Sequence, residues 1–123
     1  MIAAANEAKS STKILGVSLL TSLDDSDTKM LYSNSFDNQF NNLMAVASNT
    51  DVDGIVCSSQ ELMMLSDNPI LKVVPGIRNH NLSDDQKRTM TSKEAYENGA
   101  DFIVVGRPIT QAKNIDQAIF EYS

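Results

Sequence analysis

A glycine followed by an arginine, Gly106-Arg107, comes directly after an apolar run at residues 102–105. A glycine lets an anion approach the backbone N–H groups closely, because no side chain stands in the way. The neighbouring guanidinium can donate two parallel hydrogen bonds to phosphate oxygens. The pair therefore predicts a phosphate-binding site at the end of this run.

A second apolar run, at residues 71–74, also ends in residues that could bind a ligand. It continues into Pro75-Gly76-Ile77-Arg78 and then into a polar stretch that lasts until Thr89. Such a connection is long for the passage from a strand to a helix, and long loops of this kind often cover ligands. Residues 75–90 are therefore predicted to form a phosphate-gripping loop.

The basic residues gather in the same part of the chain, although the net charge is −6 and argues against a nucleic-acid-binding protein. Residues 72–113 hold seven of the ten basic residues, including all three arginines, against five acids. Residues 1–71 hold three basic residues against nine acids. Arginines kept together in an acidic chain favour a small anion as ligand. A solvated charged face is the alternative.

Other residues that often carry chemistry give weaker signals. His80 is the single histidine and stands in a polar loop, where solvation is expected. Cys57 ends an apolar run with no histidine near it in sequence, so a packed thiol is expected rather than a nucleophile. No Cys, His or carboxylate cluster has the spacing of metal ligands, and neither a metal nor a cofactor is expected.

The composition is that of one ordinary globular domain, with 41% hydrophobic and 21% charged residues in 123. No apolar run approaches the roughly 18 residues that a membrane span requires, and the first residues make a poor signal peptide. A single cysteine allows no internal disulfide, which suits the cytoplasm. We therefore expect a cytoplasmic protein that associates with no membrane.

Four short apolar runs are predicted to be buried parallel strands, at residues 14–20, 54–57, 71–74 and 102–105. Helical patterns separate them. Thr91 and Glu94 fit a capping box, Gly99 stands where a helix end favours a left-handed residue, and Asn114 could cap a last helix. The repeated strand–helix pattern predicts the α/β class.

Three motifs, at residues 75–78, 84–88 and 99–110, together resemble the last two βα units of orotidine 5′-monophosphate decarboxylase, a TIM-barrel lyase of pyrimidine synthesis. The resemblance covers about residues 1–120 and is strongest after Leu71. It implies half of a TIM (β/α)8 barrel, with four parallel strands equivalent to strands 5–8. A complete barrel typically needs about 250 residues. We therefore expect one truncated half-barrel domain over residues 1–123, with residues 1–12 as the tail of the helix preceding the first strand.

The resemblance also implies roles for individual residues. Arg107 and the backbone of Gly106 resemble the family's phosphate anchor, and Gln86 resembles the lid residue that closes on the same phosphate. Ser22 resembles the serine that contacts the carboxamide of the pyrimidine. The implied set for substrate and phosphate binding is Arg107, Gly106, Gln86, Ser22, Pro75, Gly76 and Arg78.

The sequence departs from the family at the catalytic array. The family uses an Asp-Lys-Asp array on strands two and three, and these strands have no counterpart here. The string from Asp27 to Lys29 imitates its start, but Tyr32 stands where the second aspartate belongs, and we expect a solvated helix face there. Smaller departures are Val74, where the bacterial pattern usually has threonine, and Ser92, where it often has proline.

Two functional hypotheses follow from this pattern. The first is the C-terminal half of an orotidine 5′-phosphate decarboxylase, which carries the phosphate site and is inactive alone. The second is a non-catalytic phosphate- or nucleotide-binding half-barrel, or a decayed split-gene product. The expected ligand is phosphate or a nucleotide monophosphate.

A half-barrel also has an expected partner. Cutting a barrel leaves bare strand edges and apolar side chains, which favour association. We expect self-association or pairing with an N-terminal half-barrel. The side chains predicted to face inward are Val17, Ile55, Val73 and Val104.

Overall fold

Short strands alternate with helices throughout residues 1–20, 22–79 and 89–123, the parts of the chain that this computed structural model describes. The strands are β1 (Leu15–Val17), β2 (Gly54–Val56), β3 (Leu71–Pro75) and β4 (Phe102–Val104). The helices are α1 (Ile2–Ala8), α2 (Asp25–Tyr32), α3 (Phe36–Asn49), α4 (Ser59–Met64), α5 (Ser92–Glu97), α6 (Arg107–Thr110) and α7 (Ile115–Tyr122). The predicted α/β class is confirmed.

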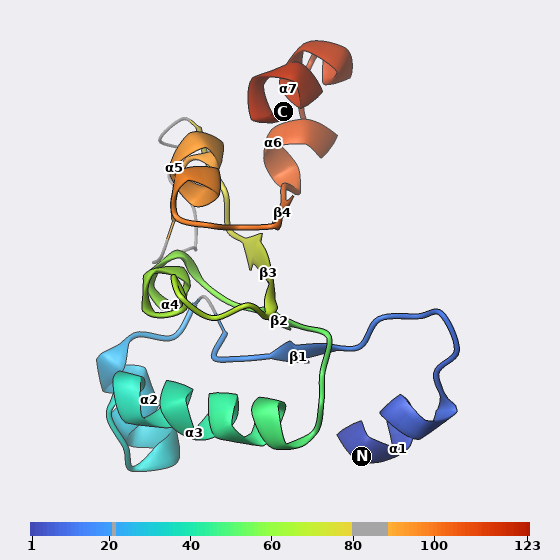
Figure 1. Ribbon diagram of the computed structural model, residues 1–123. Helices are drawn as coiled ribbons and strands as arrows, with labels where there is room; N and C mark the ends of the chain where they lie inside the picture. Colours follow the sequence, from blue (N-terminus) through green and yellow to red (C-terminus); the bar gives the residue numbers. More distant parts are fainter. Residues whose placement is uncertain (21, 80–88) are drawn as a thin grey trace.

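The strands form one parallel sheet in the order β1-β2-β3-β4, which is the order of the chain. Parallel neighbours require a connection that returns the chain to the start of the next strand. Helices provide these returns, and Figure 1 shows α3, α4 and α5 along one side of the row of strands. The predicted half-barrel, with four parallel strands and flanking helices, is confirmed.

The two faces of the sheet differ sharply in exposure. Side chains alternate between the faces along each strand, and the pairing register sets which of them share a face. One row consists of Val17, Val56, Val73 and Phe102. In this row Val17 is 62% exposed and Phe102 is 57% exposed. The face that carries this row is therefore open over much of its area.

The opposite face supplies the core. Ile55 pairs with Gly16 and Lys72, so it points away from the row of Val17. Its side chain is 1% exposed and belongs to the same buried cluster as Phe40 and Leu62. The expectation that Ile55 shares a face with Val17 is therefore wrong. Apolarity alone cannot assign a face, because a one-residue change of register moves a side chain to the other side.

Polar side chains fix where the helices begin. Full capping boxes open α2, α4 and α5, with the pairs Asp24/Asp27, Ser58/Glu61 and Thr91/Glu94. The predicted box at Thr91 is confirmed. Asn114 caps α7 by accepting from the Gln117 N–H at 3.1 Å, and Gly99 has a left-handed φ of 88°, as predicted.

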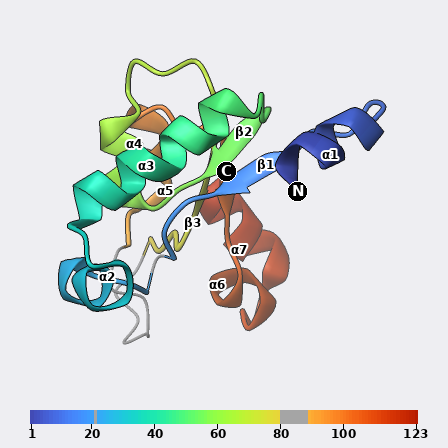
Figure 2. The same cartoon turned by 90° about the horizontal axis from the view of Figure 1, so that it is seen from below.

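The chain begins with α1, which contains no buried residue. This helix fills part of the predicted segment 1–12, and Lys9 after it is extended. Asn6 fastens α1 by donating to the Asp51 carbonyl at 3.1 Å and to the Thr50 carbonyl. Lys9 Nζ lies 2.5 Å from an Asp53 carboxylate oxygen. Figures 1 and 2 together place α1 beyond β1 and α7 beyond β4.

Candidate functional site

The carboxyl ends of β3 and β4 lie side by side. Pro75, the last residue of β3, pairs in register with Val104, the last residue of β4. Gly76 follows β3 directly, and Gly106-Arg107 follows β4 after one residue. Four of the predicted site residues, Pro75, Gly76, Gly106 and Arg107, thus come from adjacent strand ends.

Gly106 offers open space at the start of α6. A Cβ atom built on it would meet no atom within 4 Å, and the residue itself is exposed. Its carbonyl accepts from the N–H groups of Ile109 and Thr110, at 2.9 and 3.0 Å. These bonds turn the chain into α6 and leave Arg107 exposed at its first position. A small anion could therefore approach this backbone without steric hindrance.

The predicted loop leaves β3 through a tight turn at Gly76, and its two ends pair at Ile77 and Met90. Gly76 has a φ of 78°, a left-handed conformation that glycine adopts without strain. Ile77 and Met90 then form a parallel bridge, and the Arg78 N–H donates to the Met90 carbonyl at 2.9 Å. The neck of the loop is therefore fixed. Gln86 and His80 lie outside the described residues.

Arg78 and Arg107 differ in exposure and in their described contacts. Its guanidinium donates to the carbonyl of Ile77 at 2.8 Å, within the neck of the loop. The side chain is half-buried, whereas Arg107 is exposed. Through its described contacts Arg78 braces the loop, whereas Arg107 is exposed at the first position of α6.

The end of β1 lies farther away on the same side of the sheet. Ser22 is exposed, in a turn that the Leu23 N–H closes on the Leu20 carbonyl at 3.0 Å. Because β1 and β4 are the outer strands, three strand spacings of about 4.8 Å separate their ends along the sheet, roughly 14 Å. Ser22 therefore lies at the same edge of the sheet as Gly106 and Arg107, but after the opposite outer strand.

A small apolar hollow of about 90 Å³ lies near the ends of β1 to β3. Its lining comes from three strand ends and includes Val17, Leu19, Leu20, Val56, Cys57 and Pro75. This surface stands between the Ser22 turn and the glycines of β3 and β4. It suits a flat apolar group better than a charged one.

Cys57 is packed, as predicted. Its side chain is 1% exposed, and burial raises the pKa of the thiol to about 12, with the nearby Glu61 adding to the rise and Lys72 opposing it. The thiolate is the nucleophilic form, so this thiol is inert at neutral pH. Cys57 contributes shape to the hollow rather than chemistry.

The imitation of the catalytic motif on α2 is a solvated helix face, also as predicted. Asp27 accepts from the Asp24 N–H at 3.1 Å and so completes a capping box. Lys29 lies 2.6 Å from Asp25, and both side chains are more than half exposed. The ion pair with Lys29 lowers the pKa of Asp25, helped by the Phe36 N–H. These contacts give Asp27 and Lys29 local roles in the helix.

The sequence reasoning missed Glu61, which lies fully buried beside the ends of β1 and β2. Its carboxylate accepts from the Ser58 N–H at 2.5 Å and lies 2.8 Å from the Ser18 hydroxyl. The spacing of Ser58 and Glu61 fits a capping box, so its local role was detectable. The contact with Ser18 spans 43 positions of the chain and leaves no local signal.

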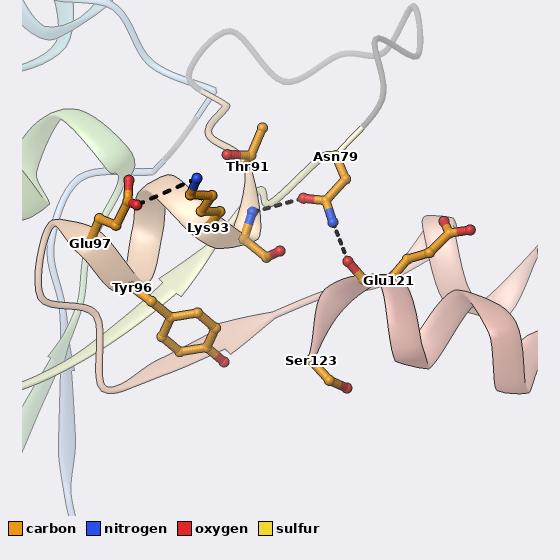
Figure 3. A pocket seen from close by; sticks show the side chains of 8 residues that line it. Asn79, Thr91, Lys93, Tyr96, Glu97, Glu121 and Ser123 are labelled. Carbon is orange, nitrogen blue, oxygen red and sulfur yellow. Dashed lines mark hydrogen bonds and ion pairs between the residues drawn. The ribbon is translucent and has the colours of Figure 1, made fainter.

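A wider hollow, of about 580 Å³, lies between α5 and α7 (Figure 3). Asn79 bridges the two helices there by donating to the Glu121 carbonyl at 2.5 Å and accepting from the Ser92 N–H at 2.8 Å. Lys93 pairs with Glu97 at 3.8 Å on its rim. The polar groups are engaged with one another, which is typical of helix packing.

The described residues contain neither a metal-ligand cluster nor a membrane-spanning helix. Within residues 1–20, 22–79 and 89–123, no group of three or more His, Cys, Asp or Glu side chains could hold a metal ion. None of the helices in these same ranges is long and apolar enough to cross a membrane.

Comparison with known proteins gives consistent matches. A sequence profile described as the Orotidine 5′-phosphate decarboxylase / HUMPS family matches residues 1–122. The orotidine 5′-phosphate decarboxylase of Aquifex aeolicus is 45% identical over 120 residues, which are 93% of this chain and 52% of that protein. Its counterpart in Helicobacter pylori is 38% identical, over 94% of this chain and 53% of that one.

Solved structures agree with the sequence matches. The crystal structure of the Lactobacillus acidophilus orotidine 5′-phosphate decarboxylase has a TM-score of 0.75 and 31% identity, and covers 99% of this chain and 58% of its own. An uncharacterized conserved protein from Geobacillus kaustophilus shares the fold with a TM-score of 0.70 at 24% identity. The chain spans about half the length of the curated relatives it matches.

Proposed function

The chain belongs to the orotidine 5′-phosphate decarboxylase / HUMPS family, and from this premise we propose that it binds the phosphate of a pyrimidine nucleoside 5′-monophosphate. The exposed Arg107 beside the uncovered backbone of Gly106 is the observation that carries the proposal. Such a pair combines a charge-assisted fork with N–H donors. Gln86 would close over the same phosphate.

The other predicted residues extend this site toward the nucleoside. Pro75 and Gly76 would line the base and ribose, and Ser22 would contact the carboxamide of the pyrimidine. The apolar hollow between these strand ends supports the proposal, since a flat base needs an apolar surface and a few placed polar groups. Arg78 would act through the loop, because its described contacts lie in the loop neck.

We further propose that this chain provides binding and that a second half-barrel provides the reaction. Decarboxylation breaks the bond between the pyrimidine ring and its carboxyl group, releases CO2 and leaves a carbanion that takes up a proton. The family's Asp-Lys-Asp array would stabilise and protonate that carbanion, and no Asp-x-Lys-x-x-Asp string occurs in this sequence. An N-terminal half or a second copy would dock on the open sheet face.

We place this activity in the cytoplasm, where a lone cysteine such as Cys57 is common.

A non-catalytic phosphate- or nucleotide-binding half-barrel is the second candidate. Such a protein would need the anchor at Arg107 and no Asp-Lys-Asp array. The two candidates differ in one result, since only the first regains decarboxylation when an N-terminal half bearing Asp-x-Lys-x-x-Asp is added.

Calorimetry with inorganic phosphate and with uridine 5′-monophosphate tests the binding site. Loss of a charge-assisted contact costs about 1.5–3 kcal/mol, so Arg107→Ala should weaken both ligands by about 10- to 100-fold. Lys93→Ala is the matched control, because Lys93 is an exposed cation on α5 with an ion pair to Glu97. If Arg107→Ala binds both ligands as well as the unchanged chain does, the proposal fails.

A further inference from the structure

Glu61 differs from the other acidic residues that complete capping boxes. The boxes of α2, α4 and α5 each place a carboxylate at the third helical position, at Asp27, Glu61 and Glu94. Asp27 accepts from the Asp24 N–H, and Glu94 accepts from the N–H and the hydroxyl of Thr91. Glu61 is fully buried, and it also reaches a neighbouring strand end, that of β1.

The carboxylate of Glu61 joins two strand ends. On the side of β2 it accepts from the Ser58 N–H at 2.5 Å. On the side of β1 its oxygens lie 2.8 Å from the Ser18 hydroxyl and 3.4 Å from the Leu19 nitrogen. The Ser18 N–H and the Val56 carbonyl, 3.1 Å apart, extend the ladder at the same point. One side chain thus fixes the place where β1 leaves the sheet.

The burial of Glu61 has a free-energy cost that its hydrogen bonds must offset. Glu61 is 0% exposed, and a carboxylate taken out of water is costly unless hydrogen bonds replace its hydration. The N–H groups of Ser58 and Leu19 face its acceptor oxygens, and the Ser18 hydroxyl lies between Glu61 and the Val56 carbonyl, at 2.8 and 3.0 Å, so that its single hydrogen is shared. A helix cap needs none of this burial, as the exposed contacts of Glu94 show.

We propose that Glu61 is a positioning residue for the nucleoside end of the binding site. It holds Ser18 and Leu19 in place, and the chain runs from them through Leu20, which lines the apolar hollow, to Ser22. The inference rests on the proposed function, because it assigns the base to this end of the sheet. The phosphate anchor at Gly106 and Arg107 lies two strands beyond β2 and does not depend on Glu61.

The test separates base binding from phosphate binding. Glu61→Gln replaces one acceptor oxygen with an NH2 group that would meet donors. The variant should bind uridine 5′-monophosphate at least about tenfold more weakly and bind inorganic phosphate within about twofold of the unchanged chain. Glu94→Gln, which alters an exposed capping box, should change neither affinity. A loss of both affinities to the same degree in Glu61→Gln, or of neither, overturns the proposal.

A second measurement makes the result independent of ligand binding. Amide hydrogen exchange should speed up at Leu19 and at the turn around Leu23 in Glu61→Gln and stay unchanged there in Glu94→Gln. If the unchanged chain binds neither ligand, the proposed function fails, and the exchange rates alone decide the positioning role. Unaltered exchange at Leu19 would then refute it.

Ser18→Ala provides the milder variant in case Glu61→Gln does not fold. It removes the hydroxyl that β1 shares between Glu61 and the Val56 carbonyl, and it leaves the capping box of α4 intact. We expect the same selective loss of nucleotide affinity and faster exchange at Leu19. Retention of both properties in Ser18→Ala would overturn the proposal.

Discussion

Gly54 and Gly106 both lack a side chain, but the space around their Cα atoms differs. A Cβ atom on Gly54 would stand 2.6 Å from Leu15 Cδ2 and 2.9 Å from both Leu71 Cβ and the Leu71 carbonyl oxygen. A Cβ atom on Gly106 would meet nothing within 4 Å. The first glycine is therefore required by the packing of the strands, whereas the fold places no such demand on the second.

Substitution of each glycine by alanine should separate these roles. Gly54→Ala overpacks the sheet and should lower the free energy of unfolding by about 1–3 kcal/mol. Gly106→Ala should change it by no more than about 0.5 kcal/mol and weaken phosphate binding, because the added methyl covers the approach to the backbone. Urea denaturation and calorimetry measure the two effects. Equal stability losses in both variants would contradict this explanation.

Cys57 offers a residue-scale test of the packed thiol. With its pKa raised to about 12 by burial, the folded chain holds almost none of the reactive thiolate at pH 8. Alkylation by iodoacetamide should be slower in the folded chain than in urea on the order of a thousandfold, from the thiolate fractions alone. Mass spectrometry follows the labelling, and fast labelling of the folded chain at pH 8 would show that the thiol is accessible.

At the scale of elements, local sequence signals predicted most of the helices and strands but few of the contacts between them. The capping box at Thr91, the cap at Asn114 and the left-handed Gly99 are each encoded within a few residues, so the sequence predicted them correctly. The face assignment of Ile55 failed because it depends on register with β1 and β3. The contact of Glu61 with Ser18 could not be predicted from the sequence for the same reason, since long-range packing brings these two residues together.

The same limit applies to the candidate site. The strand endings at Pro75-Gly76 and Gly106-Arg107 were predicted from apolar runs followed by turn residues, and parallel pairing brings them together at one edge. The different exposure of Arg78 and Arg107 could not be predicted, because both follow a strand and a glycine. Contacts with Ile77 and Met90, made in the folded neck, distinguish Arg78.

Asp53 connects the segment after α1 with the start of β2, and its contacts predict that the stability of the chain falls in acid. Its carboxylate lies 2.5 Å from Lys9 Nζ and accepts from the Ile14 N–H at 2.7 Å, and these contacts, led by the bond with Lys9, lower its pKa. The unfolded carboxyl has the ordinary pKa of about 3.9. The stabilisation is therefore complete above that value and is lost as the pH falls through the lower pKa of the folded state.

Asp53→Asn should therefore melt at a lower temperature than the unchanged chain at pH 7, and the difference should shrink as the pH falls below about 4. Asp25 and Glu94 also have lowered pKa values and remain in the variant, so part of the acid dependence should persist. Thermal melts by circular dichroism from pH 7 to pH 2 provide the measurement. A constant difference over this range would contradict the role of the carboxylate.

For the whole molecule, the open sheet face is the dominant physical feature. Val17 and Phe102 stand at the two ends of one apolar row, each more than half exposed. Among the described residues, β1 and β4 each have a strand neighbour on one side only. Exposed apolar rows between free strand edges favour association with another sheet.

Association should therefore depend on this face. Phe102→Asp places a charge in the row and should shift the chain toward monomer in sedimentation velocity over a range of concentrations. Phe120→Asp is the matched control, because Phe120 is 82% exposed on α7 rather than on the sheet. A concentration-independent monomer in the unchanged chain would refute association, and an equal effect of both variants would show that the sheet face is not responsible.

Catalysis is the last property that belongs to the whole molecule. Binding energy from a remote phosphate accelerates a reaction only when it is used to stabilise a transition state at the reacting centre. This chain offers the proposed phosphate grip and the Ser22 contact, while Asp27 and Lys29 are engaged on an exposed helix face. We therefore expect no decarboxylation of orotidine 5′-phosphate above background by the chain alone. A separately produced N-terminal half bearing Asp-x-Lys-x-x-Asp should restore turnover, measured as loss of substrate absorbance, and Arg107→Ala should reduce the restored rate. Turnover by the chain alone that Lys29→Ala abolishes would instead assign the reaction to α2.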